Sequence, residues 1–337
     1  MNGIKALIAG LAIGIATTAS AQDRITLKVA TFTPAQTDIV TGILDPWLKR
    51  VQEASGDAFD YKIYAGGTLG RNPAEQLSLV QNGIADMAYV ALSYNQGAYD
   101  EYNVAELPLL AETSRESSVG LWAALDQGLL REPEGVKVLG LWAGGMTGLH
   151  MAGDAAGLED LSGKKLRAAG RIQSDSLAAL GGVPVGNLPA PSVAEALSRG
   201  VVDGAAMTWG AVYAFRLDQV TSSHLDIALG ELPVMVPINI DTWEALPQEA
   251  RDAFEAEMGR DWSLWAGGVM ESSVEEDLTA LREDDAHTIV EFPEDQRADL
   301  GARLGKIADD WGAESDTNAA VLEAYKTAIE EYRAEGS

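Results

Sequence analysis

The stretch of residues 161–206 constrains the fold more than any other part of the chain, because strand and helix patterns alternate along it. Gly181 and Gly200 end the two expected helices, since glycine accepts the left-handed conformation that terminates helices. Ser192 and Glu195 have the spacing of a capping box. The predicted order is a strand at Lys165–Ala168, a helix at Ile172–Leu180, a strand at Val183–Val185, a helix at Pro191–Arg199 and a strand at Val201–Ala206. Such an order is typical of an open α/β sheet, and α/β is the predicted fold class.

Arg167 is the most informative single residue of this stretch. It lies at the carboxyl end of the first predicted strand, in a chain with 24 Lys and Arg against 51 Asp and Glu. Ligands of open α/β sheets bind at strand ends, and a guanidinium presents a planar fork that matches a carboxylate. Arg167 therefore predicts a small organic anion as ligand. A salt bridge to Asp160 or Asp203 is the competing interpretation, and Arg171 is a competing cation in the same region.

Three motifs surround Arg167. They are Asp160-Leu161-x-Gly163-x-Lys165-Leu166-Arg167, Leu180-Gly181-Gly182-x-Pro184-Val185 and Glu195-Ala196-Leu197-x-x-Gly200-Val201-Val202-Asp203-Gly204. Their order and spacing resemble the solute-binding proteins of tripartite ATP-independent periplasmic (TRAP) transporters, the DctP-like family. Similar segments extend the resemblance over nearly the whole mature chain, at Gly66–Gly70, Gly83–Ala88, Glu106–Pro108 and Trp243–Pro247.

The resemblance implies a two-lobed periplasmic binding protein fold (type II-like), with a hinge between the lobes and long C-terminal bracing helices. It also implies a receptor that closes around a small organic acid anion, a carboxylate or a sulfonate. The receptor would deliver this solute to a TRAP membrane permease for cation-gradient-driven uptake. Arg167 matches the position that holds the anion in the family. A periplasmic enzyme acting on an organic acid is one alternative, and a binding protein of an ABC importer or a sensor kinase is another.

The resemblance also suggests where the other ligand contacts lie. The family more often has an arginine at the position of His150, so His150 is expected to supply a second contact to the anion. Met207 stands where polar residues are common, which predicts a less polar end of the solute. Trp209 is expected to form an apolar wall, with ordinary core packing as the alternative. The remaining expected contacts come from strand ends, at Phe32, Thr33, Tyr94 and Asn239.

Residues 1–21 are predicted to be a cleaved signal peptide, so that the mature protein begins at about Gln22 in the periplasm. Lys5 supplies the positive start, the apolar run Ala6–Ala16 is too short to span a membrane, and Ala19–Ala21 is a small-x-small cleavage site. An uncleaved anchor is the alternative. The chain has no cysteine, which excludes disulfides, thiol catalysis and an acylated-cysteine anchor.

Paired glycines in Gly144–Met146 predict the crossover between the lobes, because glycine permits the bending that a two-lobed binder needs. The predicted division places residues 22–146 and 233–272 in lobe I. Residues 147–232 and 273–320 form lobe II, and residues 321–337 form a C-terminal helix.

The net charge of the chain and the absence of catalytic and nucleotide-binding motifs limit its possible partners and activities. The formal net charge is −27, and removal of the signal segment with its one lysine and no acid makes it −28. Such a surface repels nucleic acid and anionic lipid, and the protein is expected to act as a monomer without nucleic acid. Zinc-helix, nucleophile-elbow and P-loop motifs are absent beyond the signal segment, and His224 and His287 show no catalytic spacing. No catalysis, metal or cofactor is therefore expected, and His150 is the acid–base candidate of the enzymatic alternative.

Overall fold

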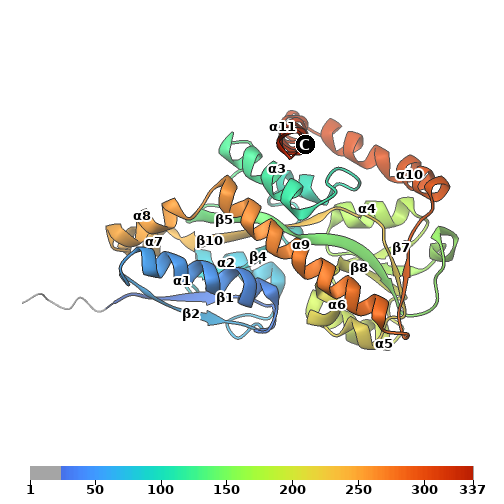
Figure 1. The fold of residues 1–337 in the computed structure, drawn as a ribbon, viewed down its shortest axis with the longest axis horizontal. Helices are drawn as coiled ribbons and strands as arrows, with labels where there is room; N and C mark the ends of the chain where they lie inside the picture. Colours follow the sequence, from blue (N-terminus) through green and yellow to red (C-terminus); the bar gives the residue numbers. More distant parts are fainter. Residues whose placement is uncertain (1–23, 337) are drawn as a thin grey trace, which may run out of the picture.

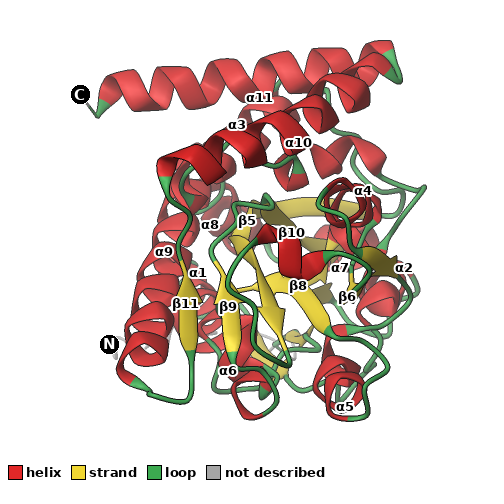
Figure 2. Ribbon diagram, turned by 90° about the vertical axis from the view of Figure 1, so that its right-hand side faces the viewer, coloured by secondary structure: helices red, strands yellow, loops and turns green. Residues whose placement is uncertain are grey.

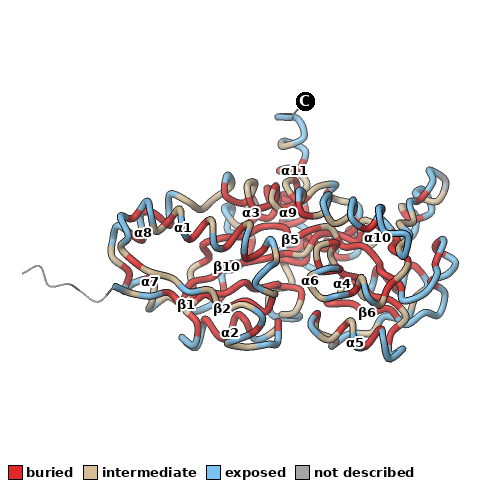
Figure 3. The backbone as a smooth tube through the Cα atoms, turned by 60° about the horizontal axis from the view of Figure 1, so that its bottom comes forward, coloured by how far each residue is buried: buried red, intermediate tan, exposed pale blue. Residues whose placement is uncertain are grey.

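One strand, β5 (Val136–Met151), runs through both halves of the molecule in a computed structural model that describes residues 24–336 (Figure 1). The strand is buried along nearly its whole length (Figure 3). Its hydrogen-bonded partners change between Met146 and Thr147, and the adjacent Gly145 has a φ of +105°. The sequence predicts two extended pieces here, but the strand is continuous. The pairing with β10 is interrupted here by a β-bulge, since Met146 pairs with Glu231 and Ala143 with Pro233, and glycine adopts the positive φ of such a bulge without strain.

The strands on either side of β5 form two parallel groups. The other strands are β1 (Thr26–Ala30), β2 (Asp60–Tyr64), β3 (Met87–Ala88), β4 (Val90–Ala91), β6 (Lys165–Arg167), β7 (Val183–Val185), β8 (Gly204–Thr208), β9 (Ser223–Leu225), β10 (Glu231–Asn239) and β11 (Thr288–Val290). The sheet order is β2-β1-β3-β10-β5-β8-β6-β7, with β4 beside β10 and β9 between β5 and β11. Strands β1 to β3 run parallel, as do β6 to β8, whereas β5 is antiparallel to both β10 and β8.

Helices cover the sheet and its two ends. The α-helices are α1 (Asp45–Ala54), α2 (Gln76–Gln81), α3 (Ser114–Asp126), α4 (Arg171–Ala179), α5 (Val193–Ser198), α6 (Ala211–Ala214), α7 (Ile240–Ala245), α8 (Gln248–Ala256), α9 (Arg260–Glu283), α10 (Glu294–Ala313) and α11 (Asp316–Glu335). A π-helical segment, η1 (Ile39–Leu44), precedes α1, and the 3₁₀ turns are η2 (Pro73–Glu75), η3 (Leu92–Tyr94), η4 (Asp100–Glu106), η5 (Leu158–Leu161), η6 (Ala190–Ser192) and η7 (Leu217–Gln219).

Pro46 accounts for the change from π- to α-helix at the start of α1. Proline has no amide hydrogen, so it cannot donate to the carbonyl of Gly42 four residues earlier, and the preceding turns widen. The sequence predicts a helix over Asp38–Ala54 that is kinked or restarted at Pro46, and the change of helix type at Asp45 agrees with this prediction.

The central strand–helix unit forms in the predicted order, with two local corrections. The chain enters α5 through the 3₁₀ turn η6, and the Ser192 side chain makes no capping hydrogen bond. The expected capping box is therefore wrong, because Ser192 already has a helical backbone and Glu195 pairs with Arg199 instead. The last strand, β8, begins at Gly204, three residues after its predicted start at Val201.

Helix α9 braces the molecule from one lobe to the other (Figure 1). It packs on α3 and β5, and a Cβ atom at Gly267 would lie only 2.7 Å from the Ser114 carbonyl oxygen. The sequence predicts one helical stretch from Pro247 to Leu281, but Gly259, with a φ of +104°, separates α8 from α9. Gly259 is the N-cap of α9, with a ψ of −168°, and this backbone conformation is one that glycine adopts much more readily than other residues.

The last two helices lie over α3 and one end of the sheet (Figure 2). Helix α11 packs on α3, where the Tyr325 hydroxyl bonds the Ser117 hydroxyl at 2.7 Å, and on α10. This helix begins at Asp316, because Ser315 caps it by accepting from the amide of Asn318. The predicted C-terminal helix over residues 321–337 therefore starts five residues too late.

The architecture is the two-lobed α/β fold that the sequence predicts. Strands β5 and β10 and helix α9 connect the lobes, so the predicted boundary between residues 272 and 273 falls inside a continuous helix. We keep the division into lobes as a proposal. The expected signal peptide and its cleavage site lie outside the described residues. Within residues 24–336, no helix is both long and apolar enough to cross a membrane.

Glu231 is a buried carboxyl group where the lobes meet. It is 1% exposed at the start of β10, and the Ser114 hydroxyl lies 3.0 Å from each carboxyl oxygen. Burial, together with the charge of Glu271, raises its pKa to about 8. The hydrogen bonds from Ser114 and the Gly145 amide act in the opposite direction. Glu231 is therefore largely protonated at neutral pH.

We predict that Glu231→Gln flattens the dependence of stability on pH. The folded state keeps a proton that the unfolded chain releases above its ordinary pKa of 4.5, so folding loses free energy as pH rises toward 8. From pH 6 to pH 8 the wild type should lose about 2 kcal/mol more than the variant, or several degrees of melting temperature. Thermal unfolding at both pH values measures the difference. The exposed Glu275→Gln on α9 is the control, and an unchanged slope in Glu231→Gln would contradict the assignment.

Candidate functional site

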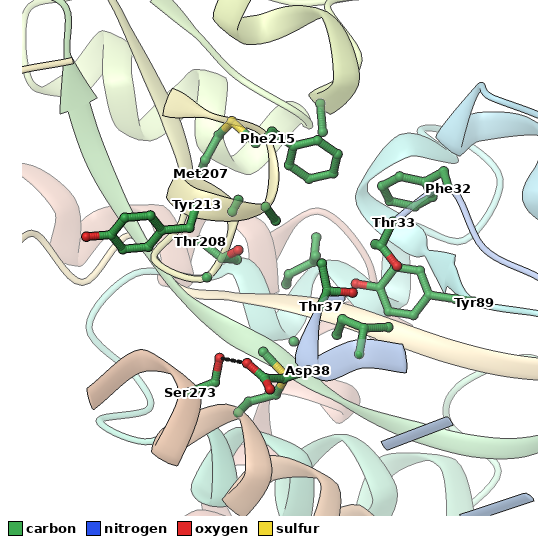
Figure 4. A pocket seen from close by; sticks show the side chains of 18 of the residues that line it. Phe32, Thr33, Thr37, Asp38, Tyr89, Met207, Thr208, Tyr213, Phe215 and Ser273 are labelled. Carbon is green, nitrogen blue, oxygen red and sulfur yellow. Dashed lines mark hydrogen bonds between the residues drawn. The ribbon is translucent and has the colours of Figure 1, made fainter. Parts of the chain in front are cut away.

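A cavity of about 230 Å³ lies between the lobes, against α9 (Figure 4). Strand ends and loops of both lobes line it, and most of its walls are apolar or aromatic. The lining side chains include Phe32, Thr33, Thr37, Asp38, Tyr89, Tyr94, Arg167, Gln173, Met207, Tyr213, Phe215, Ser273 and Asp277. The cavity has the size of a small organic molecule and lies where open α/β sheets bind ligands.

Arg167 is held rigidly at the end of β6. Its Nε donates to the Leu188 carbonyl at 3.0 Å, one terminal nitrogen donates to the Ala206 carbonyl at 2.9 Å, and the other to the Tyr94 hydroxyl at 2.7 Å. These bonds use three of the five guanidinium N–H groups. One N–H on each terminal nitrogen is left without a partner among the described residues, while the side chain is only 1% exposed.

No carboxylate in the described part of the chain forms an ion pair with Arg167. Asp160 accepts from the Ala156 amide and Asp203 from the Lys165 amide, so neither makes the salt bridge that was the competing interpretation. Arg171 pairs with Glu314 at 2.7 Å and lies outside the cavity lining. The charge of Arg167 is therefore buried and unpaired, which is costly unless an anion joins it.

A buried glutamate lies behind the cavity. Burial raises the pKa of Glu106 to about 7, although the Ser93 hydroxyl, which donates at 2.7 Å, and the charge of Arg167 lower it. Its second carboxyl oxygen has no partner among the described residues. Gln173, which lines the cavity, lies 3.4 Å from the first oxygen. Because Glu106 is only partly ionised at neutral pH, it balances the charge of Arg167 only in part.

Aromatic rings form the walls next to Arg167. The ring centroid of Phe32 lies 5.5 Å from that of Tyr89, 6.2 Å from that of Tyr94 and 6.4 Å from that of Phe215, which stacks on it. The Tyr89 side chain is 3% exposed, and its hydroxyl has no hydrogen-bond partner among residues 24–336. Sequence reasoning missed Tyr89 and Phe215. The residues Ala85–Val90 have a strand pattern that includes Tyr89, whereas no local pattern marks Phe215.

Carboxylates line another part of the cavity. Asp38 precedes η1 and accepts a hydrogen bond from the Ser273 hydroxyl at 2.7 Å (Figure 4). Asp277 lies one helical turn further along α9, where burial and the charges of Asp38 and Glu276 raise its pKa to about 6. Sequence reasoning missed both residues, because single carboxylates carry no signal in a chain this acidic.

Contacts across the cavity hold the lobes together. Arg167 of β6 reaches Tyr94 of η3, and the Gln96 side chain donates to the Ala169 carbonyl at 3.0 Å. Phe32 stacks on Phe215 from the opposite lobe. The structure therefore describes the lobes in contact around the site.

Five of the eight expected ligand contacts line the cavity: Phe32, Thr33, Tyr94, Arg167 and Met207. The other three do not, and each has a different role. Asn239 caps α7 by accepting from the Thr242 amide and donates to the Val80 carbonyl. Trp209 is buried, with its ring 5.0 Å from His150 and against Gly148. The core-packing alternative describes its position.

His150 belongs to a chain of three buried histidines. Its Nε2 donates to the Met207 carbonyl at 3.1 Å, so its Nδ1 accepts from His224 Nδ1 at 2.9 Å. His224 Nε2 in turn accepts from His287 at 3.0 Å. Burial lowers the pKa of His150 to about 4 and, with the two neighbouring rings, that of His224 to about 3. The His150 ring is neutral, bonded at both nitrogens and outside the cavity lining, which corrects the expectation that His150 contacts the anion.

A family model fits this architecture and site. The model described as bacterial extracellular solute-binding protein, family 7 (DctP), matches residues 29–314. The chain belongs to this family. A solute-binding protein of Albidiferax ferrireducens is 28% identical over 213 residues, which cover 60% of this chain and 61% of that relative. Family 7 proteins are solute-binding proteins of transport, and the resemblance to the TRAP receptors is confirmed.

Solved structures of TRAP solute-binding proteins share the fold over nearly the whole chain. A TRAP solute-binding protein from Rhodoferax ferrireducens, in complex with copurified benzoate, is 24% identical with a TM-score of 0.84, covering 93% of this chain and all of that one. A marine metagenome TRAP protein specific for aromatic acid ligands, with 3-hydroxybenzoate, is 24% identical with a TM-score of 0.84, covering 92% and 99%. Among the described residues, no group of three or more potential ligands is arranged to hold a metal ion.

We predict that His150→Ala destabilises the protein without removing anion binding. The substitution leaves a cavity and deprives the Met207 carbonyl and His224 of their partners, which costs about 2–4 kcal/mol of unfolding free energy. Affinity for small carboxylates, measured by calorimetry on the folded variant, should change by less than about threefold, or below 1 kcal/mol. Unchanged stability together with a large loss of affinity would restore His150 as a ligand contact.

Proposed function

We propose that the protein is the extracytoplasmic receptor of a TRAP transporter and that its solute is a small aromatic monocarboxylate. The observation that carries this proposal is the buried, unpaired guanidinium of Arg167 with two free N–H groups at a partly open cavity between the lobes. These two groups suit the two oxygens of one carboxylate. An anion in this place would stabilise the lobes in contact, because it touches both only when they are closed.

The cavity walls support an aromatic solute. Phe32, Tyr89, Tyr94 and Phe215 offer ring faces and edges close to the cation, and a volume of about 230 Å³ suits one small ring acid. Aromatic pairs favour stacked and edge-to-face arrangements, which a planar solute can extend. The similar folds with benzoate and 3-hydroxybenzoate are in keeping with this class of ligand.

The remaining expectations complete the proposal. The protein acts as a monomer in the periplasm after cleavage near Gln22, without a nucleic acid partner, and hands its solute to the membrane permease subunits. The alternative of an enzyme on an organic acid rested on His150 as acid–base residue. That ring is buried, bonded at both nitrogens and outside the cavity lining. It is therefore not placed to serve as the acid–base residue that the enzymatic alternative requires.

We predict that Arg167→Ala lowers the affinity for benzoate at least about 30-fold, or about 2 kcal/mol, because hydrogen bonds to a charged group are lost. Arg167→Lys should also weaken binding, since a point charge does not replace the fork. A thermal-shift screen of mature protein against aromatic and aliphatic acids, sulfonates and neutral sugars identifies the class, and calorimetry gives the affinities. Ligand at about 100 times its dissociation constant should add roughly 2.7 kcal/mol of stability.

The control for this screen is Arg171→Ala, which removes a cation of the same loop region outside the cavity. Binding by Arg171→Ala should equal that of the wild type. An acid-induced shift that persists in Arg167→Ala, or no shift with any acid, would overturn the proposed function.

A further inference from the structure

We infer that the solute carries a second polar group, a hydrogen-bond donor, that Asp38 and Asp277 receive while Arg167 holds its carboxylate. This inference rests on the proposed function and narrows its substrate class to ring carboxylates with a hydroxyl or ammonium substituent. It also predicts that the site rejects a second carboxylate.

The two aspartates face the cavity without a cationic partner. Neither forms a salt bridge with a lysine, arginine or histidine of residues 24–336, and both line the same cavity as Arg167. The charges that act on Asp277 are those of Asp38 and Glu276, whereas Arg167 acts on Glu106. The cavity therefore has a cationic part and a separate anionic part.

Asp38 is oriented toward a donor. Its position before η1 is that of a helix cap, yet its side chain makes no capping bond. One carboxylate oxygen accepts from Ser273, a residue of α9, and the other has no partner among the described residues. Asp38 is solvent-exposed at the edge of the cavity, and because Ser273 of α9 fixes its side chain, the second oxygen remains available to a ligand group.

The Tyr89 hydroxyl is an independent indication of a polar ligand group. Tyr89 lines the cavity, and only 3% of the residue is exposed. Its hydroxyl has no hydrogen-bond partner in the described part of the chain. The hydroxyl oxygen opens onto the cavity instead of being enclosed by protein, so it is available to a polar group of a bound molecule. Figure 4 shows it beside Thr33 and Thr37, and Thr37 precedes Asp38 in the chain.

The charged groups in the two parts of the cavity determine which solutes bind. A hydroxyl or ammonium group donates to a carboxylate, and such charge-assisted bonds are stronger than neutral ones. A second carboxylate on the solute would instead face Asp38 and Asp277 at short range, where like charges repel. Dicarboxylates of similar shape should therefore bind poorly.

Calorimetry with four kinds of benzoic acid tests the inference. The series is unsubstituted benzoate, hydroxybenzoates, aminomethylbenzoates and benzenedicarboxylates, each substituted compound as its meta and para isomer. At least one donor-bearing isomer should bind on the order of tenfold tighter than benzoate, and both dicarboxylates at least on the order of tenfold weaker, as hydrogen bonds to charged groups imply.

The matched variants are Asp277→Asn and Glu275→Gln, which remove one negative charge each from the same helix, inside and outside the cavity. Asp277→Asn should reduce the ratio of aminomethylbenzoate to dicarboxylate affinity on the order of tenfold. Glu275→Gln should leave the ratio unchanged. Asp38→Asn is a second variant with the same expectation, and melting temperatures verify that each variant is folded.

The outcomes separate the two proposals. Binding of benzoate with equal affinity for donors and dicarboxylates would overturn this inference and leave the aromatic acid receptor intact. Equal effects of Asp277→Asn and Glu275→Gln would also overturn it, because net charge alone would then explain the selection. No binding by any compound of the series would overturn the proposed function, and the inference with it.

Discussion

The site depends on a buried guanidinium whose charge the protein itself leaves unpaired. Arg167 is positioned by two carbonyl groups and the Tyr94 hydroxyl, all of them neutral acceptors. These bonds fix the orientation of the side chain and leave the charge to be balanced. Burying an unpaired charge is unfavourable. An anion that enters the site removes this cost, and the stabilisation is greatest when the closed lobes exclude water. Binding and closure are thus one event.

The connections between the lobes allow that event. Strand β5 continues through a β-bulge at Gly145, β10 pairs with it on both sides of the bulge, and α9 lies across both lobes. Glu231 lies at this junction as a largely neutral carboxyl group bonded to Ser114, so the junction buries little charge at neutral pH. Helix α9 also lines the cavity, through Ser273 and Asp277. A ligand in the cavity would therefore contact the helix that braces the two lobes.

The sequence predicted those features that are encoded locally. The strand–helix unit around Arg167 followed from periodicity and glycine stops, and Arg167 itself from a strand end and a motif. The predictions failed where distant segments meet. His150 pairs across the sheet with Ala205 and His224, so its ring lies among other rings of the core. Phe215 and Asp277 reach the cavity from α6 and α9 only once the chain has folded, and no local pattern marks such an approach.

The acidic surface and the anionic solute are reconciled by distance and burial. A net charge of −27 repels an anion from afar, but salt screens charges that are exposed and more than a Debye length apart. Inside the cavity screening is weaker, so Arg167 dominates over the surface and attracts one carboxylate strongly. The same weak screening makes the half-buried Asp277 effective against a second one, with the exposed Asp38 beside it. An acidic protein can therefore bind an acid selectively, because the few charges in the cavity outweigh the many outside.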